Sequence, residues 1–185
     1  WANRVTDIRS SVELLRLIGL LRSGVLLNGQ PLPGPVDFAA GCAFASGANL
    51  KNETQWLARK IEAGAEFVLT QPVFTREDFE RVREAIASYS RQVFIGVMPV
   101  TSAKQVSFLQ SGRIPGINLP EPAAAEISRF SRAADQAQAG LDLAGRLIDT
   151  LRTEVFGIYL IMPFGGRSAE WSADLVRRAK AAKGG

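Results

Sequence analysis

The side chains available for chemistry in this sequence are limited by what is absent. None of the 185 residues is a histidine, and Cys42 is the only cysteine. Histidine is the commonest general base and, with cysteine, the commonest zinc ligand, so we expect no metal site. Any reaction must use carboxylates, amides, lysine, arginine, tyrosine or a bound cofactor. A single cysteine forms no internal disulfide, which is compatible with a reducing cytoplasm.

Gln71 is the polar residue whose position most favours a binding role. It follows the apolar run "EFVLT", residues 66–70, which predicts a short buried strand. The C-terminal ends of parallel strands line the ligand crevice of α/β proteins, and a carboxamide both donates and accepts hydrogen bonds. The other strand ends are mostly apolar, which favours a flat heteroaromatic ligand. The alternative is an amide that caps a loop, with Phe44 and Pro163 as ordinary core and turn residues.

A second candidate site lies on the helix that we expect over 52–64. Three apolar residues at helical spacing predict its buried face: Leu50, Leu57 and Ile61. The adjoining stripe carries Glu53, Trp56 and Lys60, and Arg59 lies further round. Two basic side chains beside a strand end can hold a pyrophosphate, Arg59 by its fork and Lys60 as a point charge. The alternative is an ordinary solvated face.

The elements that position these residues alternate between strand and helix. Apolar runs predict strands at 36–44, 66–70, 92–100 and 156–164. Periodic segments with caps or glycine stops predict helices at 10–24, 52–64, 76–90, 102–112, 121–134, 136–153 and 168–182. The expected stops include Gly24, Gly64 and Gly112. This alternation predicts an α/β fold of βαβ units with a parallel sheet.

Two architectures fit that pattern, a doubly wound open sheet and part of a (β/α)8 TIM barrel. No Gly-x-Gly-x-x-Gly follows any predicted strand, which argues against a dinucleotide-binding open sheet. A complete barrel takes about 250 residues and eight strands, and only four strands are predicted here. We therefore expect residues 1–185 to form one partial barrel domain, with two open edges.

Composition and charge favour a globular chain without a membrane or nucleic-acid role. The chain is 46% hydrophobic and 22% charged, with a net charge of +4, which raises the prospect of an anionic partner. The basic residues are scattered, however, and the cluster "RRAKAAK" lies at the tail, residues 177–183. We expect no nucleic-acid binding. No apolar run reaches about 18 residues and no signal sequence is visible, so neither a membrane span nor secretion is predicted.

The segment "LARKIEAGAEFVLTQPVF", residues 57–74, resembles the signature of the methylenetetrahydrofolate reductase family. In that family a helix ending in Lys-x-x-Ala-Gly-Ala leads into a strand ending in Thr-Gln. The segments "SSVELLRLIGLLRSGVLLNGQPLPGPVDFAAGCAF" and "FIGVMPVTSAKQVSFLQSGRIPGINLPE" are similar to its fifth and seventh strands with their neighbours. The segment "VFGIYLIMPFGG" resembles the eighth strand of bacterial members fused to a homocysteine methyltransferase domain. The resemblance covers about residues 5–180.

The resemblance implies a flavin-dependent barrel, of which this chain is the second half, strands five to eight. Such an enzyme passes a hydride from NAD(P)H to FAD and then to the methylene carbon of 5,10-methylenetetrahydrofolate, giving 5-methyltetrahydrofolate. By this analogy Gln71 hydrogen-bonds the folate pterin. The other residues implied on the substrate side are Phe108, Leu109, Ile161 and Pro163. Those implied around the flavin, its ribityl chain, phosphates and adenosine are Cys42, Phe44, Glu53, Arg59, Lys60 and Leu69.

Departures from the family pattern leave a second function open. Phe44 replaces a tyrosine of many members, Trp56 replaces a polar residue, and "YLIMPFGG" replaces a His-x-Tyr-x-x-Asn type of ending. The family's general acid, a Glu on the first strand, and the flavin contacts of strands two to four have no counterpart. We expect a fragment that is inactive alone, or a chain completed by self-association or by a partner that supplies the missing half. The alternative function is a non-catalytic folate- or flavin-binding or assembly domain.

A third function is compatible with the same residues. An unrelated α/β barrel enzyme acting on a phosphorylated metabolite would also present apolar strand ends and basic side chains. It requires the match of "AGAEFVLTQ", residues 63–71, to be accidental.

Overall fold

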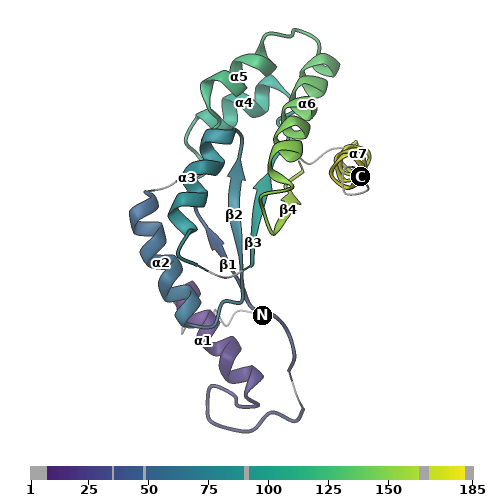
Figure 1. The fold of residues 1–185 in the computed structure, drawn as a ribbon. Coiled ribbons are helices and arrows are strands. Elements are labelled where there is room, and N and C mark those ends of the chain that lie inside the picture. Colours follow the sequence, from purple (N-terminus) through teal and green to yellow (C-terminus); the bar gives the residue numbers. More distant parts are fainter. Residues whose placement is uncertain (1–7, 35, 48, 90–91, 163–166, 182–185) are drawn as a thin grey trace, which may run out of the picture.

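The computed structural model describes residues 8–181 except for 35, 48, 90–91 and 163–166. Helices and strands alternate along the chain (Figure 1), which confirms the predicted α/β fold. The helices are α1 (Ser11–Arg22), α2 (Leu50–Glu62), α3 (Arg76–Ile86), α4 (Ala103–Gln110), α5 (Glu121–Ser128), α6 (Ala133–Leu151) and α7 (Ser168–Ala181). The strands are β1 (Gly41–Phe44), β2 (Phe67–Val73), β3 (Gln92–Val97) and β4 (Gly157–Leu160).

The four strands form one parallel sheet in the order β1-β2-β3-β4. Each strand therefore pairs with its neighbours in sequence, and helices make the crossovers that parallel pairing requires. All four C-terminal ends consequently reach the same edge of the sheet. In Figure 1, α4 and α5 stand beyond the tip of β2 at this edge.

One face of the sheet packs against the helices and forms the main core. Every second strand residue points into it, as the two-residue period of a strand requires. The buried members on the strands are Cys42, Phe44, Val68, Val73, Ile95 and Val97, and helical partners include Leu15, Leu57, Phe79, Val82, Leu147, Ile148 and Leu151. The predicted buried face of α2 is confirmed, because Leu57 is fully buried and Leu50 and Ile61 pack against the same core.

The opposite face of the sheet carries aromatic rings laid over glycines. A Cβ atom built at Gly41 would lie 2.3 Å from the Phe67 ring, and one at Gly157 would lie 2.7 Å from the Phe94 ring. Phe67, Phe94 and Phe156 also meet edge to face, with ring centroids 6.1 and 5.2 Å apart. The glycines therefore let the rings lie close to the backbone of the neighbouring strands.

A second, smaller core lies beyond the C-terminal ends of the strands. It joins α4 and α5 to the segments that lead into and out of them. Its buried members are Phe74, Val100, Val106, Leu109, Leu119, Ala123, Ala124 and Ile127. This core holds the loop between α4 and α5 against the sheet edge, and that loop contributes to the site described below.

The helix ends follow the predicted signals closely. The hydroxyl of Ser10 accepts a hydrogen bond from the Glu13 amide and so caps α1. The expected stops Gly24, Gly64 and Gly112 have φ angles of 81°, 107° and 70°, which a side chain would disfavour. The helices predicted at 121–134 and 136–153 are divided differently, since α5 ends at residue 128 and α6 begins at 133.

The strands differ from the prediction at their ends. The strand predicted at 36–44 is regular only from Gly41, because β2 begins at Phe67, the partner of Gly41, and offers no strand beyond it. The strand predicted to end at Thr70 continues to Val73. The strand predicted at 92–100 ends at Val97 instead, two residues before a proline.

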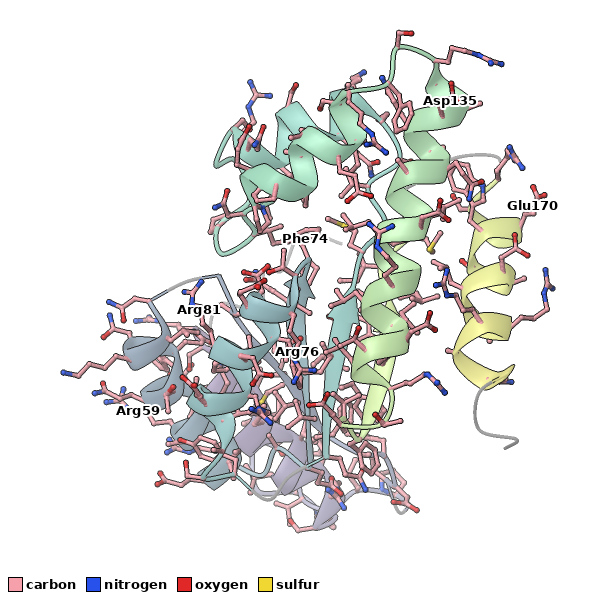
Figure 2. The ribbon with its side chains drawn as sticks, turned by 45° about the horizontal axis from the view of Figure 1, so that its top comes forward. Arg59, Phe74, Arg76, Arg81, Asp135 and Glu170 are labelled. Carbon is pink, nitrogen blue, oxygen red and sulfur yellow. The ribbon has the colours of Figure 1, made fainter. Side chains whose placement is uncertain are left out.

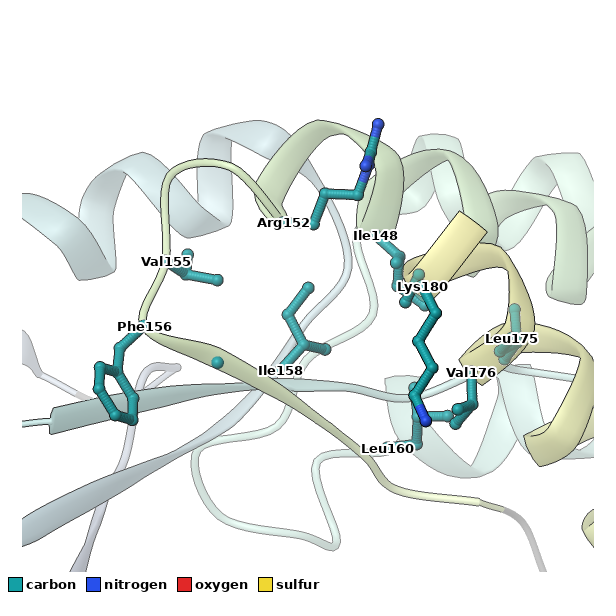
Figure 3. Close-up of a pocket in the computed structure, with 11 residues that line it drawn as sticks. Ile148, Arg152, Val155, Phe156, Ile158, Leu160, Leu175, Val176 and Lys180 are labelled. Carbon is teal, nitrogen blue, oxygen red and sulfur yellow. The ribbon is translucent and has the colours of Figure 1, made fainter. Parts of the chain in front are cut away.

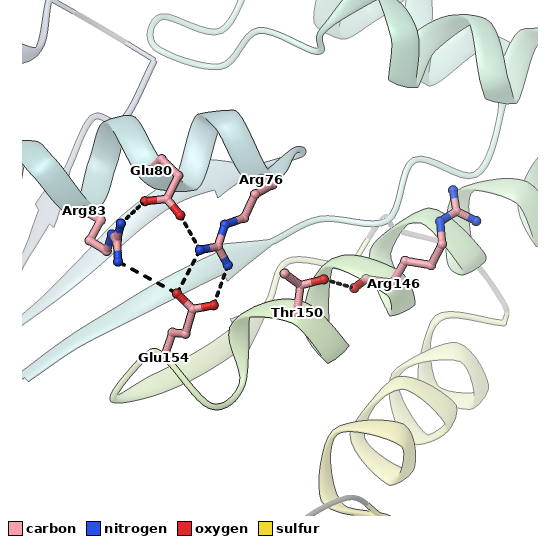
Figure 4. A network of polar contacts seen from close by, with 6 residues as sticks. All are labelled: Arg76, Glu80, Arg83, Arg146, Thr150 and Glu154. Atoms are coloured by element: carbon pink, nitrogen blue, oxygen red, sulfur yellow. Dashed lines mark hydrogen bonds and ion pairs between the residues drawn. The ribbon is translucent and has the colours of Figure 1, made fainter.

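An ion network joins α3 to the turn before β4 (Figure 4). Arg76 donates two hydrogen bonds to Glu154, at 2.5 and 2.9 Å, and both Arg76 and Arg83 pair with Glu80. The Arg76 guanidinium lowers the pKa of Glu154. Because these groups are solvated, their contribution to stability is modest. None of the helices in the described part of the chain is long and apolar enough to cross a membrane.

Candidate functional site

Gln71 lies in a bulge near the C-terminal end of β2. Leu69 pairs with Phe94, but the next paired residues are Pro72 and Gly96, so β2 has one more residue than β3 over this stretch. Proline has no amide hydrogen for a ladder and is confined to edges, strand starts and bulges. The sequence Thr-Gln-Pro therefore produces the bulge, and the bulge sets the direction of the Gln71 side chain.

The two ends of the Gln71 carboxamide have different environments. Its Nε2 donates to the carbonyl oxygen of Pro115, in the loop between α4 and α5, at 3.0 Å. Its Oε1 is buried and has no hydrogen-bond partner among the described residues. A buried acceptor without a partner costs about 1–3 kcal/mol. Gln71 is thus bonded to nearby backbone at one end, as the loop-capping alternative predicts, and has a free acceptor at the other.

Three segments converge on Gln71. Its backbone carbonyl accepts from the Ser46 hydroxyl at 3.0 Å, which ties β2 to the turn after β1. A Cβ atom at Gly116 would lie 2.2 Å from the Gln71 Oε1, and one at Gly47 would lie 2.1 Å from the Gly116 carbonyl oxygen. The loops after β1 and after α4 therefore meet around this amide, and both glycines are needed for the close approach.

A polar cavity of about 280 Å³ adjoins this junction at the C-terminal edge of the sheet. It is lined by Ser46, Gly47, Pro72, Val73, Asp78, Arg81, Gly116, Asn118 and Pro120. Asp78 is already used, because its carboxylate accepts from the amides of Phe74 and Thr75 at the start of α3. The exposed Arg81 (Figure 2) gives the cavity a cationic rim, so its lining suits an anionic or polar group.

Glu53 and Lys60 form a buried ion pair at the end of β1. The Lys60 Nζ donates to Glu53 Oε1 at 3.0 Å and to the Ala43 carbonyl oxygen at 2.8 Å. The same Glu53 oxygen accepts from the Ala45 amide at 3.2 Å. The side chains are only 16% and 11% exposed. The pair therefore fixes the turn that follows β1.

Arg59 does not join Lys60 at a common point. Its guanidinium lies 5.0 Å from the centroid of the Trp56 ring, a cation–π contact on the outer surface of α2. Figure 2 shows Arg59 pointing away from the sheet. The pyrophosphate clamp that the sequence suggests for Arg59 and Lys60 is thus not assembled in this structure, because adjacent residues of a helix project about 100° apart.

Cys42 and Phe44 lie in the main core with their side chains toward the helices. Phe44 is fully buried, and burial raises the pKa of the Cys42 thiol. A ligand on the aromatic face of the sheet meets the backbone of these residues rather than their side chains. Leu69 alternates with the buried residues of β2 and lies on that aromatic face.

The remaining residues implied by the family resemblance are dispersed. Phe108 is exposed on α4, whereas its neighbour Leu109 is buried in the second core. Ile161 follows β4 and its amide donates to the Val97 carbonyl at 2.9 Å, so it lies at the same sheet edge as Gln71. Pro163 lies outside the described residues.

An apolar cavity of about 240 Å³ lies elsewhere, between α6, β4 and α7 (Figure 3). Ile148, Ile158, Leu160 and Leu175 form its walls, and Lys180 reaches across it. None of the candidate site residues lines this cavity. It lies on the helix side of the sheet and is separate from the junction at Gln71.

Sequence reasoning missed the partners that hold Gln71. Ser46, Pro115 and Gly116 lie in loops, and the strand-end rule considered only the strands. The pair Pro115-Gly116 is a turn signal, and Gly116 does have a positive φ of 78°. That signal predicts a turn but not its contact with Gln71, which depends on how the loop packs.

The fold and site together define an α/β domain whose candidate site lies at the C-terminal ends of parallel strands. A sequence model of the family "Methylenetetrahydrofolate reductase" matches residues 3–159. The match covers most of the chain, so the chain belongs to the methylenetetrahydrofolate reductase family.

Among solved structures, the chain is similar to an uncharacterized protein from Clostridium thermocellum that binds two copies of 5-methyl-5,6,7,8-tetrahydrofolic acid. The identity is 19% and the TM-score 0.53, with 80% of this chain and 54% of that chain covered. At this identity the similarity shows the fold alone. Because only 54% of that protein is covered, this chain spans about half of its length. Comparison with curated proteins gave no match.

Proposed function

We propose that this chain is the folate-binding part of a methylenetetrahydrofolate reductase-type oxidoreductase. The observation that carries the proposal is the buried, unpartnered Oε1 of Gln71 at the C-terminal end of β2. A pterin ring presents N–H donors along one edge, and this acceptor can take such a donor once Gly116, which packs against it, moves aside. Family membership and the folate ligands of the similar structure support the same assignment.

We also propose that the sheet is the second half of a (β/α)8 barrel. The helices pack on one face of the sheet, whereas a doubly wound sheet carries helices on both faces. The sequential strand order is that of a barrel. The aromatic face would then be the barrel interior, and the other partners would be the remaining strands and, by family resemblance, a homocysteine methyltransferase domain.

A bound flavin would supply the hydride-transfer chemistry of the proposed reaction, which links NAD(P)H to the folate. Among the described residues, those implied around a flavin are not gathered at one point of the structure. Cys42 and Phe44 point into the core, and Lys60 is held by Glu53. The flavin contacts must therefore come mainly from the other half of the barrel. The role of this chain is to bind and orient the pterin through Gln71, beside an apolar face that excludes water.

The test is Gln71→Glu in the full-length protein. The change replaces the Nε2 donor by a carboxylate oxygen that repels the Pro115 carbonyl, so the side chain leaves its present position. We expect folate turnover to fall about tenfold or more while NAD(P)H-dependent flavin reduction changes little. The matched control is Gln55→Glu on the exposed side of α2. Equal losses in the two half-reactions would show that Gln71 is only structural.

A non-catalytic folate-binding domain is the second candidate. It is favoured by the same core placement of Cys42 and Phe44 and by the internal pairing of Lys60, which leave little for a flavin to contact. The visible spectrum of the purified full-length protein separates the two. A flavin absorbance band supports the oxidoreductase, and folate binding without any flavin band supports the binding domain.

A further inference from the structure

Side-chain hydroxyls complete the hydrogen bonding of the β2 bulge. The Gly96 amide of β3 donates to the Thr70 hydroxyl at 3.0 Å. The Thr70 carbonyl oxygen accepts from the hydroxyl of Tyr159, which comes from β4, two strands away. Thr70 is fully buried, so neither bond is replaced by water. The bulge therefore depends on a residue 89 positions further along the chain.

Gly96 makes this long reach possible. It pairs with Tyr159 in the sheet, and the Tyr159 side chain passes over it to reach Thr70. A Cβ atom at Gly96 would lie 3.0 Å from both the Thr70 carbonyl oxygen and the Tyr159 hydroxyl. Burial also raises the pKa of Tyr159, so the hydroxyl keeps its proton and remains a donor at neutral pH.

The Thr70 carbonyl and the Gln71 amide nitrogen belong to one rigid peptide plane. A hydrogen bond to that carbonyl therefore fixes the orientation from which the Gln71 side chain departs. On its other side Gln71 precedes Pro72, which restricts its backbone to extended conformations. These two constraints restrict the direction of the Gln71 Cα–Cβ bond, and the hydrogen bond from Nε2 to the Pro115 carbonyl then holds the carboxamide at the end of the side chain.

We propose that Tyr159 is a positioning residue, whose hydroxyl fixes the Thr70–Gln71 peptide plane and thereby aims the Gln71 carboxamide at the ligand. The identity of that ligand as a folate rests on the proposed function. Tyr159 itself need not touch the ligand. Its effect on binding passes through Gln71, and this makes the proposal separable from a general structural role.

The first test compares Tyr159→Phe with Tyr89→Phe in the full-length protein. These are the two tyrosines of the chain, and each donates one hydrogen bond to a backbone carbonyl. Tyr89 bonds to Thr54 of α2, away from Gln71. We expect Tyr159→Phe to bind 5-methyltetrahydrofolate about fivefold more weakly by titration calorimetry, and Tyr89→Phe to bind like the wild type. Unchanged affinity in Tyr159→Phe overturns the proposal.

The second test asks whether Tyr159 acts through Gln71. In a Gln71→Ala background, Tyr159→Phe should cause no further loss of affinity, because the side chain that it positions is gone. If Tyr159→Phe weakens binding by the same factor in both backgrounds, its effect is independent of Gln71 and the proposal is wrong.

A measurement without ligand separates this proposal from the proposed function. If the wild type binds no folate, the proposed function fails, but the bulge can still be examined by amide hydrogen exchange. We expect faster exchange at Gly96 and Gln71 in Tyr159→Phe, with the wild-type pattern elsewhere in the sheet. Unaltered exchange at both amides overturns the proposal whatever the ligand is.

Discussion

The buried Glu53–Lys60 pair offers the sharpest test of how the site is held in place. Lys60→Met keeps an unbranched side chain only one atom shorter but removes the donor to Glu53 and to the Ala43 carbonyl. The Glu53 carboxylate then remains at the end of β1 and keeps its hydrogen bond from the Ala45 amide, at 3.2 Å. The change therefore leaves a largely buried charge without its counter-ion.

The magnitude follows from the burial of the two side chains. Removing one partner of a buried ion pair costs about 3–5 kcal/mol. Here the side chains are still 11% and 16% exposed and Glu53 keeps one donor, so the cost should fall just below that range. We expect Lys60→Met to lower the free energy of unfolding by about 2–3 kcal/mol. Adding Glu53→Gln removes the stranded charge, and the double variant should recover to within about 1 kcal/mol of the wild type.

The assay is urea unfolding of the full-length protein at pH 7, followed by far-UV circular dichroism. Lys51→Met, at an exposed position of the same helix, is the control and should stay within about 0.5 kcal/mol of the wild type. A Lys60→Met variant as stable as this control would refute the reasoning. So would a double variant no more stable than the single one, because the cost would then come from lost packing rather than from an unpaired charge.

Two further predictions concern the loop at Gln71 and the ion network of α3. Gly116→Ala places a methyl group 2.2 Å from the Gln71 Oε1, at a residue whose φ is 78°. We therefore expect this variant to lose measurable 5-methyltetrahydrofolate binding in calorimetry. Gly112→Ala is the control, because it carries the backbone strain alone. Glu154→Gln tests the lowered pKa of Glu154. A carboxyl group whose pKa is lowered by folding stabilises the fold at pH values above its ordinary pKa of 4.5, so the wild type should have a higher melting temperature than the variant at pH 7. The difference should vanish as the pH falls well below 4.5. A difference that persists at low pH would contradict this assignment.

The helices were accessible from the sequence because their signals are local. Ser10 caps a helix and Gly64 ends one wherever the chain folds, since capping and positive φ are properties of a few neighbouring residues. The strand limits were less accessible. Residues 36–40 are apolar enough for a strand, but a strand needs a partner, and β2 does not extend that far.

The candidate site was only partly accessible for a related reason. The position of Gln71 at a strand end follows from the local pattern, but its bulge arises from Pro72, whose effect on pairing was not anticipated. Lys60 points toward Glu53 because its ammonium group also bonds to the backbone at the end of β1. The position of Lys60 on the helix was equally compatible with a phosphate contact. The link from Tyr159 to Thr70 crosses a strand, and no pattern in the sequence signals it.

The second core has a thermal consequence for the site. Pro115, which holds the Gln71 carboxamide, belongs to a loop anchored by buried residues such as Leu109 and Leu119 rather than by the main core. Small clusters of this kind open at lower free energies than the sheet they adjoin. On warming, ligand affinity should therefore be lost at a lower temperature than the helical signal of the main core. Storage temperature, and not only global melting, then decides whether a preparation is competent.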